Sequence, residues 1–200
     1  NLKAAFFLAR FCDVKGVILT VSDEELSFES ALWLAQSYLE NGEIDLALVG
    51  GCDVFTPTVE EYRQRMNALP SNSRNLFIGE GSSWFLLGAG QPNKMGDILA
   101  VFMDSSKRTP DDYLQSEEYA ALLSAAGDMD RRLWLPGFRL KKPVAPAGWD
   151  LHDYLEHCGV HPTASAFGLA HAMKKNRSSL LISYNCSASG KPAVIVAVTT

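Results

Sequence analysis

The segment LTVSDEELSFESALWLAQSYLENGEIDLALVGGCDVF, residues 19–55, carries the pattern on which the predicted fold depends. VILTV (17–21), which overlaps its start, and IDLALVGG (44–51) are continuously apolar, as strands covered on both faces are. Between them, apolar residues recur at helical spacing, and Asn41-Gly42 is a typical helix end. The predicted apolar stripe of this helix is Phe28, Ala31, Leu32, Ala35, Tyr38 and Leu39. A helix between two buried strands predicts an α/β fold with a central sheet.

The predicted helix opens on three consecutive acidic residues, Asp23, Glu24 and Glu25. Ser22 and Glu25 have the Ser-x-x-Glu spacing of a capping box. A carboxylate at a helix start is also stabilised by the helix dipole, typically by about 0.3–1 kcal/mol. We therefore expect Glu25 to cap the helix, with a catalytic base or decarboxylation residue as the alternative role.

The alternation of strands and helices continues along the rest of the chain. The pattern predicts helices over 2–12, where the helix is buried, and over 56–69, 110–126, 149–159 and 163–176. It predicts strands over 79–88, 97–104 and 131–137, a loop over 138–148, and a closing hairpin formed by 179–186 and 193–199. Because no internal repeat or low-complexity linker interrupts the order, one domain over 1–200 is expected.

Composition and charge exclude several classes of protein. The chain of 200 residues is 47% hydrophobic and 20% charged, which is ordinary for a globular protein. Its net charge of −5 disfavours nucleic acid or an anionic membrane surface as the main partner. No apolar run reaches the roughly 18–20 residues that a membrane span needs. Because the first residue is Asn1 rather than Met, we expect a fragment or a processed chain.

Cysteine and histidine spacing gives little support for a metal site. The four cysteines are far apart and form no Cys-x-x-Cys pair, which favours buried free thiols in a reducing cytoplasm. His157 and His161 are four residues apart, but Gly159 and Pro162 interrupt the helix that would place them on one face. We expect no metal and no cofactor. The cysteines are Cys12, Cys52, Cys158 and Cys186.

Four segments together resemble the β-ketoacyl synthase family of the thiolase fold. GEIDLALVGGCDVF (42–55) and FIGEGSSWFLLG (77–88) are similar to the Gly-Gly strand and the Gly-Glu-Gly turn that follow the family's nucleophile helix. GVHPTASAFGLAHAMKK (159–175) resembles its Gly-His-x-x-x-Ala-x-Gly helix, and SYNCSASGKPAVIV (183–196) its gating loop and last strand. The resemblance implies a thiolase-like fold of mixed sheets layered with helices, reduced or truncated on the N-terminal side.

The same resemblance implies that the reactive groups of the family are replaced. Counting back from Gly50-Gly51, the nucleophilic cysteine falls at Glu25, and the two histidines fall at Pro136 and Val160, with His161 one residue late. A carboxylate is a poor acyl carrier, and carbon–carbon bond formation in this family needs an activated thiolate and donors aimed at an enolate oxygen. The resemblance therefore implies no catalytic residues in this chain.

A ketosynthase-like chain without reactive groups is similar to the chain-length factors, the non-catalytic partners in ketosynthase heterodimers, including those of aryl polyene biosynthesis. This implies a catalytic ketosynthase as partner, an acyl carrier protein reached through the complex, and a cytoplasmic location. In the family, the strand before the nucleophile helix pairs across the subunit boundary. The candidate interface or tunnel residues are Val17, Leu19, Phe28, Leu32, Trp33, Tyr184 and Cys186.

Two other interpretations remain open at this stage. One is a thioester decarboxylase or acyltransferase of the same fold that uses Glu25, His161 or Cys186. The other is a folded scaffold with no tunnel. Five basic residues in and just after the strand predicted over 131–137 form a cluster, which we expect to be a solvated face, with docking of an acyl carrier protein as the alternative. This cluster is Arg131, Arg132, Arg139, Lys141 and Lys142.

Overall fold

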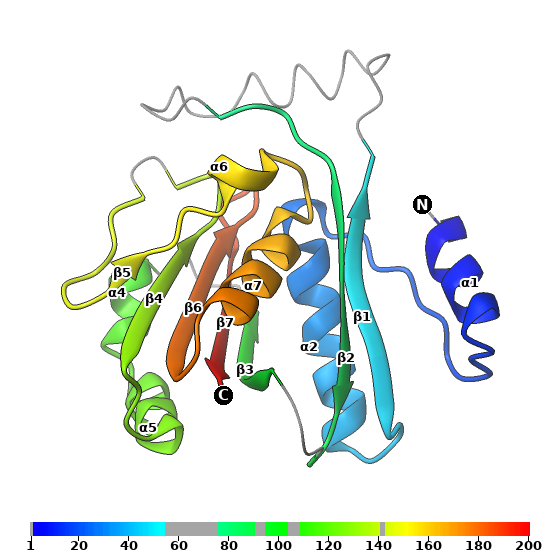
Figure 1. Cartoon of the computed structure of the whole chain (residues 1–200), viewed down its shortest axis with the longest axis horizontal. Coiled ribbons are helices and arrows are strands. Elements are labelled where there is room, and N and C mark those ends of the chain that lie inside the picture. Colours follow the sequence, from blue (N-terminus) through cyan, green and yellow to red (C-terminus); the bar gives the residue numbers. More distant parts are fainter. Residues whose placement is uncertain (1, 55–75, 91–94, 104–108, 141–142) are drawn as a thin grey trace.

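The computed structural model describes residues 2–54, 76–90, 95–103, 109–140 and 143–200. The larger sheet consists of β3 (Gly96–Met103), β4 (Arg131–Pro136), β5 (Asp150–Leu151), β6 (Ser179–Cys186) and β7 (Pro192–Thr199). Its strand order is β3-β7-β6-β4-β5 (Figure 1). β7 runs antiparallel to β3 and β6, whereas β4 runs parallel to β6 and β5. This mixed sheet confirms the predicted α/β class and the closing hairpin.

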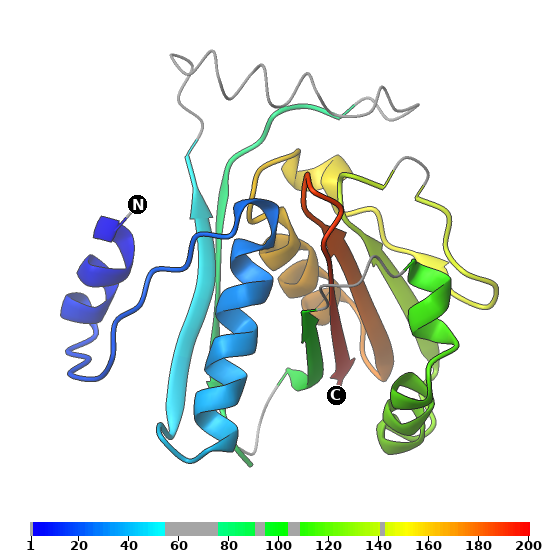
Figure 2. The same ribbon diagram turned by 180° about the vertical axis from the view of Figure 1, so that it is seen from behind.

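The second sheet pairs β1 (Leu46–Asp53) with β2 (Gly81–Gly88) in antiparallel register. α2 (Ser27–Glu40) and α7 (Ala164–Lys175) lie between the two sheets, as Figures 1 and 2 show from opposite sides. α2 contacts β1 and β3, and α7 contacts β2 and β6. In the described part of the chain the outward face of the smaller sheet is open. The exposed side chains on this face are Leu46, Leu48 and Leu86.

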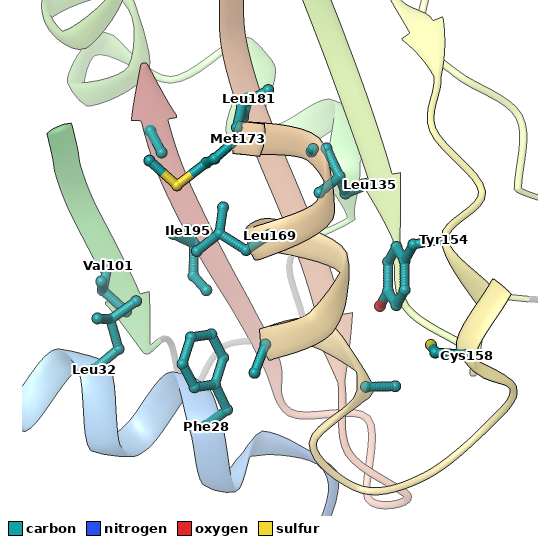
Figure 3. Close-up of a cluster of buried hydrophobic side chains, with 14 of the residues drawn as sticks. Phe28, Leu32, Val101, Leu135, Tyr154, Cys158, Leu169, Met173, Leu181 and Ile195 are labelled. Carbon is teal, nitrogen blue, oxygen red and sulfur yellow. The ribbon is translucent and has the colours of Figure 1, made fainter. Parts of the chain in front are cut away.

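The main core fills the space between the two helices and the larger sheet (Figure 3). Phe28 and Leu32 of α2 and Leu169 of α7 are buried there, against Ile195 of β7. The ring of Phe28 also meets that of Phe85 on β2, with centroids 5.6 Å apart. The apolar stripe predicted for this helix is therefore confirmed at Phe28 and Leu32. Through these residues α2 packs against both sheets.

A second core covers the opposite face of the larger sheet. α4 (Pro110–Leu114) and α5 (Glu117–Ala126) bring Tyr113 and Tyr119 onto this face. Tyr184 of β6 stacks on Trp134 of β4, with ring centroids 5.9 Å apart. Because both faces are covered, every residue of β7 is buried.

Two predictions about the start of the chain are wrong. The segment 17–21 forms no strand, and Val17 is 67% exposed and Leu19 50% exposed. α1 (Leu2–Phe11) is a helix as predicted, but Phe7 and Phe11 on it are exposed rather than buried. Both segments are apolar, but no described element packs closely enough on them to bury their side chains.

The predicted capping box is also wrong. The chain turns through the 3₁₀ helix η1 (Glu24–Leu26), and no side chain caps either η1 or α2. Instead, the Ser27 hydroxyl accepts a hydrogen bond from the Asp23 N–H and donates one to the Glu24 carbonyl. Glu24 has a φ of 49°, a left-handed conformation that the regular entrance of a capping box would not contain.

Three further predictions differ from the structure or lie outside it. The helix predicted over 110–126 is divided into α4 and α5, because Ser116 interrupts it and accepts a hydrogen bond from the Tyr119 N–H as the cap of α5. The helix predicted over 149–159 is limited to α6 (Leu155–Cys158), because β5 pairs with β4 just before it. The helix predicted over 56–69 lies outside the described residues. None of the described helices is long and apolar enough to cross a membrane.

Candidate functional site

The side chain of Asn185, the second-last residue of β6, links the groups at the start of α2. Its Nδ2 donates to the Glu25 carbonyl at 2.8 Å and to the Glu29 carboxylate at 3.0 Å. Its Oδ1 accepts from the Cys186 N–H at 2.9 Å. Gly137, directly after β4, leaves room for this amide, because a Cβ there would lie 2.3 Å from Asn185 Oδ1. The ends of β4 and β6 and the entrance of α2 therefore meet at one point.

Glu25 has both carboxylate oxygens engaged at this point. Its Oε1 forms an ion pair with the guanidinium of Arg139, and its Oε2 accepts from the Ala188 N–H at 3.1 Å. The two paired side chains are only 13% and 18% exposed. The prediction that Glu25 caps the helix is therefore wrong, because its carboxylate is drawn to Arg139 instead.

Arg139 also corrects the prediction made for the basic cluster. A solvated face is right for Arg131 and Arg132, which are exposed, but wrong for Arg139, which is largely buried against Glu25. The two lysines at 141 and 142 lie outside the described residues. Sequence reasoning missed this pairing because 114 positions separate the two partners.

Glu29 is a second buried acid, which sequence reasoning did not identify. Its side chain is 1% exposed, and its Oε2 has no hydrogen-bond partner among the described residues. Burial raises the pKa of Glu29 to about 7, although the nearby Asn185 amide and Ser165 hydroxyl favour the charged form. The burial of Glu29 could have been predicted from its position three residues before Leu32, on the buried face of the helix.

The turn between β6 and β7, residues 187–191, is fastened to the acidic entrance. Besides the Ala188–Glu25 hydrogen bond, Lys191 Nζ lies 3.3 Å from Asp23 Oδ2. A hydrogen bond from Ser30 and the Lys191 ammonium outweigh partial burial and hold the pKa of Asp23 below its ordinary value. The turn that resembles the family's gating loop is thus closed onto η1 by two side-chain contacts.

No cysteine of this chain is paired with a histidine. All four residues of each type lie within the described ranges. The Cys158 thiol donates to the Gly159 carbonyl, and no thiol makes a hydrogen bond with an imidazole in these ranges. Cys186 lies within electrostatic range of Arg139 and Glu25, but burial raises the pKa of its thiol. The pairing that activates a cysteine nucleophile is therefore not formed here.

The two predicted histidine positions, Pro136 and Val160, are both buried. Pro136 ends β4, and the next residue, Gly137, lies against the amide of Asn185, which reaches Glu25. Val160 belongs to the main core, and its backbone forms hydrogen bonds with Phe77 and Gly79. The structure therefore brings Glu25, Pro136 and Cys186 together around Asn185.

His161 lies beside Val160 and is held by Asp53, the last residue of β1. Its Nδ1 is 3.2 Å from the Asp53 carboxylate, which also accepts from the N–H and hydroxyl of Thr163 at 2.7 and 2.6 Å. Burial raises the pKa of Asp53, but these hydrogen bonds outweigh it and hold the pKa below its ordinary value. Nε2 of His161 is buried without a partner among the described residues and faces the backbone of Gly81.

Comparisons with known proteins identify the fold. No family model matches the sequence, and no curated protein matches it. Among solved structures, the ishigamide ketosynthase/chain length factor is similar with a TM-score of 0.68 and 19% identity, over 98% of this chain and 61% of that one. The ketosynthase from module 6 of the bacillaene synthase of Bacillus subtilis 168 is similar with a TM-score of 0.72 and 16% identity, over 100% and 50%.

A third solved structure agrees with these two. It is a type II polyketide synthase acyl-carrier protein in complex with its ketosynthase, and its TM-score is 0.69 at 11% identity, over 98% of this chain and 63% of that one. In all three cases the chain spans less than two thirds of the length of the similar structure. These likenesses show that the chain has the ketosynthase, or thiolase-like, fold and confirm the fold that the sequence predicted.

Proposed function

We propose that this chain is a non-catalytic ketosynthase-like subunit of the chain-length-factor type. It would pair with an active β-ketoacyl synthase and shape the acyl tunnel of that partner in fatty-acid or polyketide-type biosynthesis. One observation carries the proposal: Glu25, at the position that the resemblance assigns to the nucleophile, is engaged by Arg139 and Ala188. A carboxylate held in this way neither carries an acyl group nor leaves room for one.

The chemistry of condensation supports the same conclusion. A condensing enzyme needs a thiolate at a helix start and hydrogen-bond donors aimed at an enolate oxygen. In this chain the corresponding positions hold Glu25, Pro136 and Val160, of which the last two have no side-chain donor. A subunit built in this way contributes shape and contact area to an enzyme rather than reacting groups.

Exposed apolar side chains near the start of the chain support a protein partner. Val17, Leu19 and Trp33 are about half exposed or more, which suits a surface that a second subunit covers. Phe28 and Leu32 are buried in the core, so they can support such a surface only from behind.

The remaining two candidate residues, Tyr184 and Cys186, lie on β6. Tyr184 is buried against Trp134, and Cys186 is half-buried beside Glu25. Cys186 therefore remains a proposed tunnel residue, whereas Tyr184 is a part of the second core.

The solved structures support the proposed partners. One similar structure is named as a ketosynthase/chain length factor, and another contains an acyl carrier protein with its ketosynthase. We propose an aryl polyene as the product class.

Co-expression with a catalytic ketosynthase tests this proposal. Native mass spectrometry should find a 1:1 complex, and Val17→Asp with Leu19→Asp should reduce it, because a buried unpaired charge opposes association. Val144→Asp is the matched control, since Val144 is equally apolar and exposed on the loop after β4. A monodisperse chain that ignores the ketosynthase, or equal complex formation by both variants, contradicts the proposal.

A second function has one observation in its favour. Because Asp53 holds Nδ1 of His161, its Nε2 is left unpartnered, as in a general base. This supports a thioester decarboxylase or acyltransferase that uses His161, Glu25 or Cys186. Incubation with a malonyl-carrier protein separates the two functions, because the enzyme would release carbon dioxide or gain an acyl mass. Carbon dioxide release that is lost in the Glu25→Ala variant would favour the decarboxylase or acyltransferase function.

A further inference from the structure

Three histidines that are not adjacent in the sequence form a cluster in the structure. His171 lies on α7, His157 on α6, and His152 directly after β5. The ring centroid of His171 is 5.2 Å from that of His152 and 5.0 Å from that of His157. No contact links these rings to Glu25 or its partners, so the proposed function does not account for the cluster.

Two nitrogens of the cluster have the separation of neighbouring metal ligands. Nε2 of His152 lies 3.1 Å from Nδ1 of His171. Two imidazole nitrogens bound to one tetrahedral Zn²⁺ at about 2.0–2.1 Å lie roughly 3.3–3.4 Å apart. A small turn of either ring would therefore replace their hydrogen bond by a shared cation.

Both rings are carried by ordered elements. The ring of Phe167 stacks on His171, with centroids 5.5 Å apart and planes inclined by 12°. The backbone N–H of His152 donates to the Trp134 carbonyl at 2.9 Å, which anchors this residue to β4. The two imidazoles are therefore held next to each other by the packing of α7 and β4.

Two cationic side chains act on the proposed ligands, Arg131 on His152 and Lys175 on His171. Arg131 lies near His152, but Asp150 neutralises it through a hydrogen bond of 2.8 Å. Lys175 lies near His171 and is exposed on a flexible side chain that can turn to solvent. These neighbours favour a site of moderate affinity over a tight one.

We propose that His152 and His171 chelate a divalent transition metal ion of the Zn²⁺ class. Among the described residues, no three His, Cys, Asp or Glu side chains already surround one point as a complete metal site. The proposed form is therefore a two-nitrogen chelate completed by water, or by His157 after its ring turns. Imidazole nitrogens suit Zn²⁺, Ni²⁺ and Cu²⁺, whereas Mg²⁺ and Ca²⁺ prefer oxygen ligands.

Isothermal titration of the full chain with ZnCl₂ at neutral pH tests this site. We expect one bound Zn²⁺ per chain, and affinity at least about ten-fold lower in both His171→Gln and His152→Gln, because each removes a ligand. Titration with MgCl₂ should show no binding at the same concentrations. Lys174→Ala, an exposed change on α7, is the matched control and should bind Zn²⁺ as the unchanged chain does.

The four free cysteines are the competing ligands, and Co²⁺ distinguishes them. The visible spectrum of the Co²⁺-loaded chain should show nitrogen and oxygen ligation without the charge-transfer band of a thiolate. Absence of Zn²⁺ binding, equal affinity in all four proteins, or a thiolate band would overturn the proposal. Thermal melting of each variant establishes that a lost affinity does not come from unfolding.

Discussion

Glu25 lies at the entrance of α2, where a helix start would assist a reactive anion. Its two oxygens are instead satisfied by Arg139 from the loop after β4 and by Ala188 from the β6–β7 turn. An ion pair that is largely out of water is costly to break from one side, because the remaining charge loses its partner. The residue at the position that the resemblance assigns to the nucleophile is therefore held in place by structural contacts.

The first prediction concerns this ion pair. Arg139→Ala should lower the free energy of unfolding by roughly 1–3 kcal/mol, because it leaves the Glu25 carboxylate without its charged partner. Arg131→Ala is the matched control, since the Arg131–Asp150 pair is more than half exposed and should contribute at most about 1 kcal/mol. Urea unfolding of both variants measures the difference. Equal losses would show that the Glu25–Arg139 pair behaves as a surface contact.

The second prediction concerns the pH dependence of stability. The pKa of Glu29 is about 7 in the folded chain and 4.5 in an ordinary environment, so the folded state holds the proton more tightly. Stability from this group is present below pH 4.5 and is lost as the pH rises through about 7. Glu29→Gln keeps the acceptor for Asn185 and cannot ionise, so it should reduce this loss.

Urea unfolding at a series of pH values measures this effect. Glu40→Gln, an exposed change at the other end of α2, is the control and should keep the slope of the unchanged chain. A Glu29→Gln chain with the same slope as the control would mean that Glu29 is not the buried acid described above.

At the scale of elements, the site depends on where secondary structure ends. β4 ends at Pro136 and β6 at Cys186, and α2 begins just after η1. These ends place backbone N–H groups and the amide of Asn185 around Glu25, so that strands and a helix far apart in the chain supply one cluster. The turn over 187–191 joins this cluster through the hydrogen bond from the Ala188 N–H to Glu25.

The third prediction tests how that turn is held. Glu25→Ala should speed hydrogen exchange at the Ala188 amide, because this N–H loses its acceptor. The Gly190 amide donates to the Ser187 carbonyl within the turn and should exchange at an unchanged rate. Exchange measured by NMR separates the two amides. If both respond equally, the turn opens as a unit and Glu25 does not fasten it locally.

At the scale of the whole molecule, the sequence predicted those features that depend on local periodicity. The stripe from Phe28 to Leu39 and the apolar strands predicted α2, β6 and β7 correctly, and motif resemblance predicted the thiolase-like fold. Local patterns failed where burial depends on other layers. VILTV (17–21) is apolar enough for a strand, but in the described part of the chain nothing pairs with it.

The contacts of the candidate site were less predictable for a physical reason. Arg139 and Glu25 are 114 positions apart, and Asn185 and Glu29 are 156 apart, so only the packed sheets bring them together. The histidine cluster is a similar case, because the sequence analysis considered only His157 with His161 and rejected that pair, whereas the fold brings His157 to His171. The spacing of residues in the sequence predicts contacts within one helix or strand, but it does not predict contacts between residues of different layers.

The most direct test of the central claim is the intact mass of each subunit after the complex with a catalytic ketosynthase is incubated with an acyl donor. The account predicts that the acyl group appears on the partner alone and that the mass of this chain stays unchanged, because Glu25 occupies the place of the nucleophile. An acyl adduct on this chain, mapped to Cys186 or any other of its residues, would contradict the account.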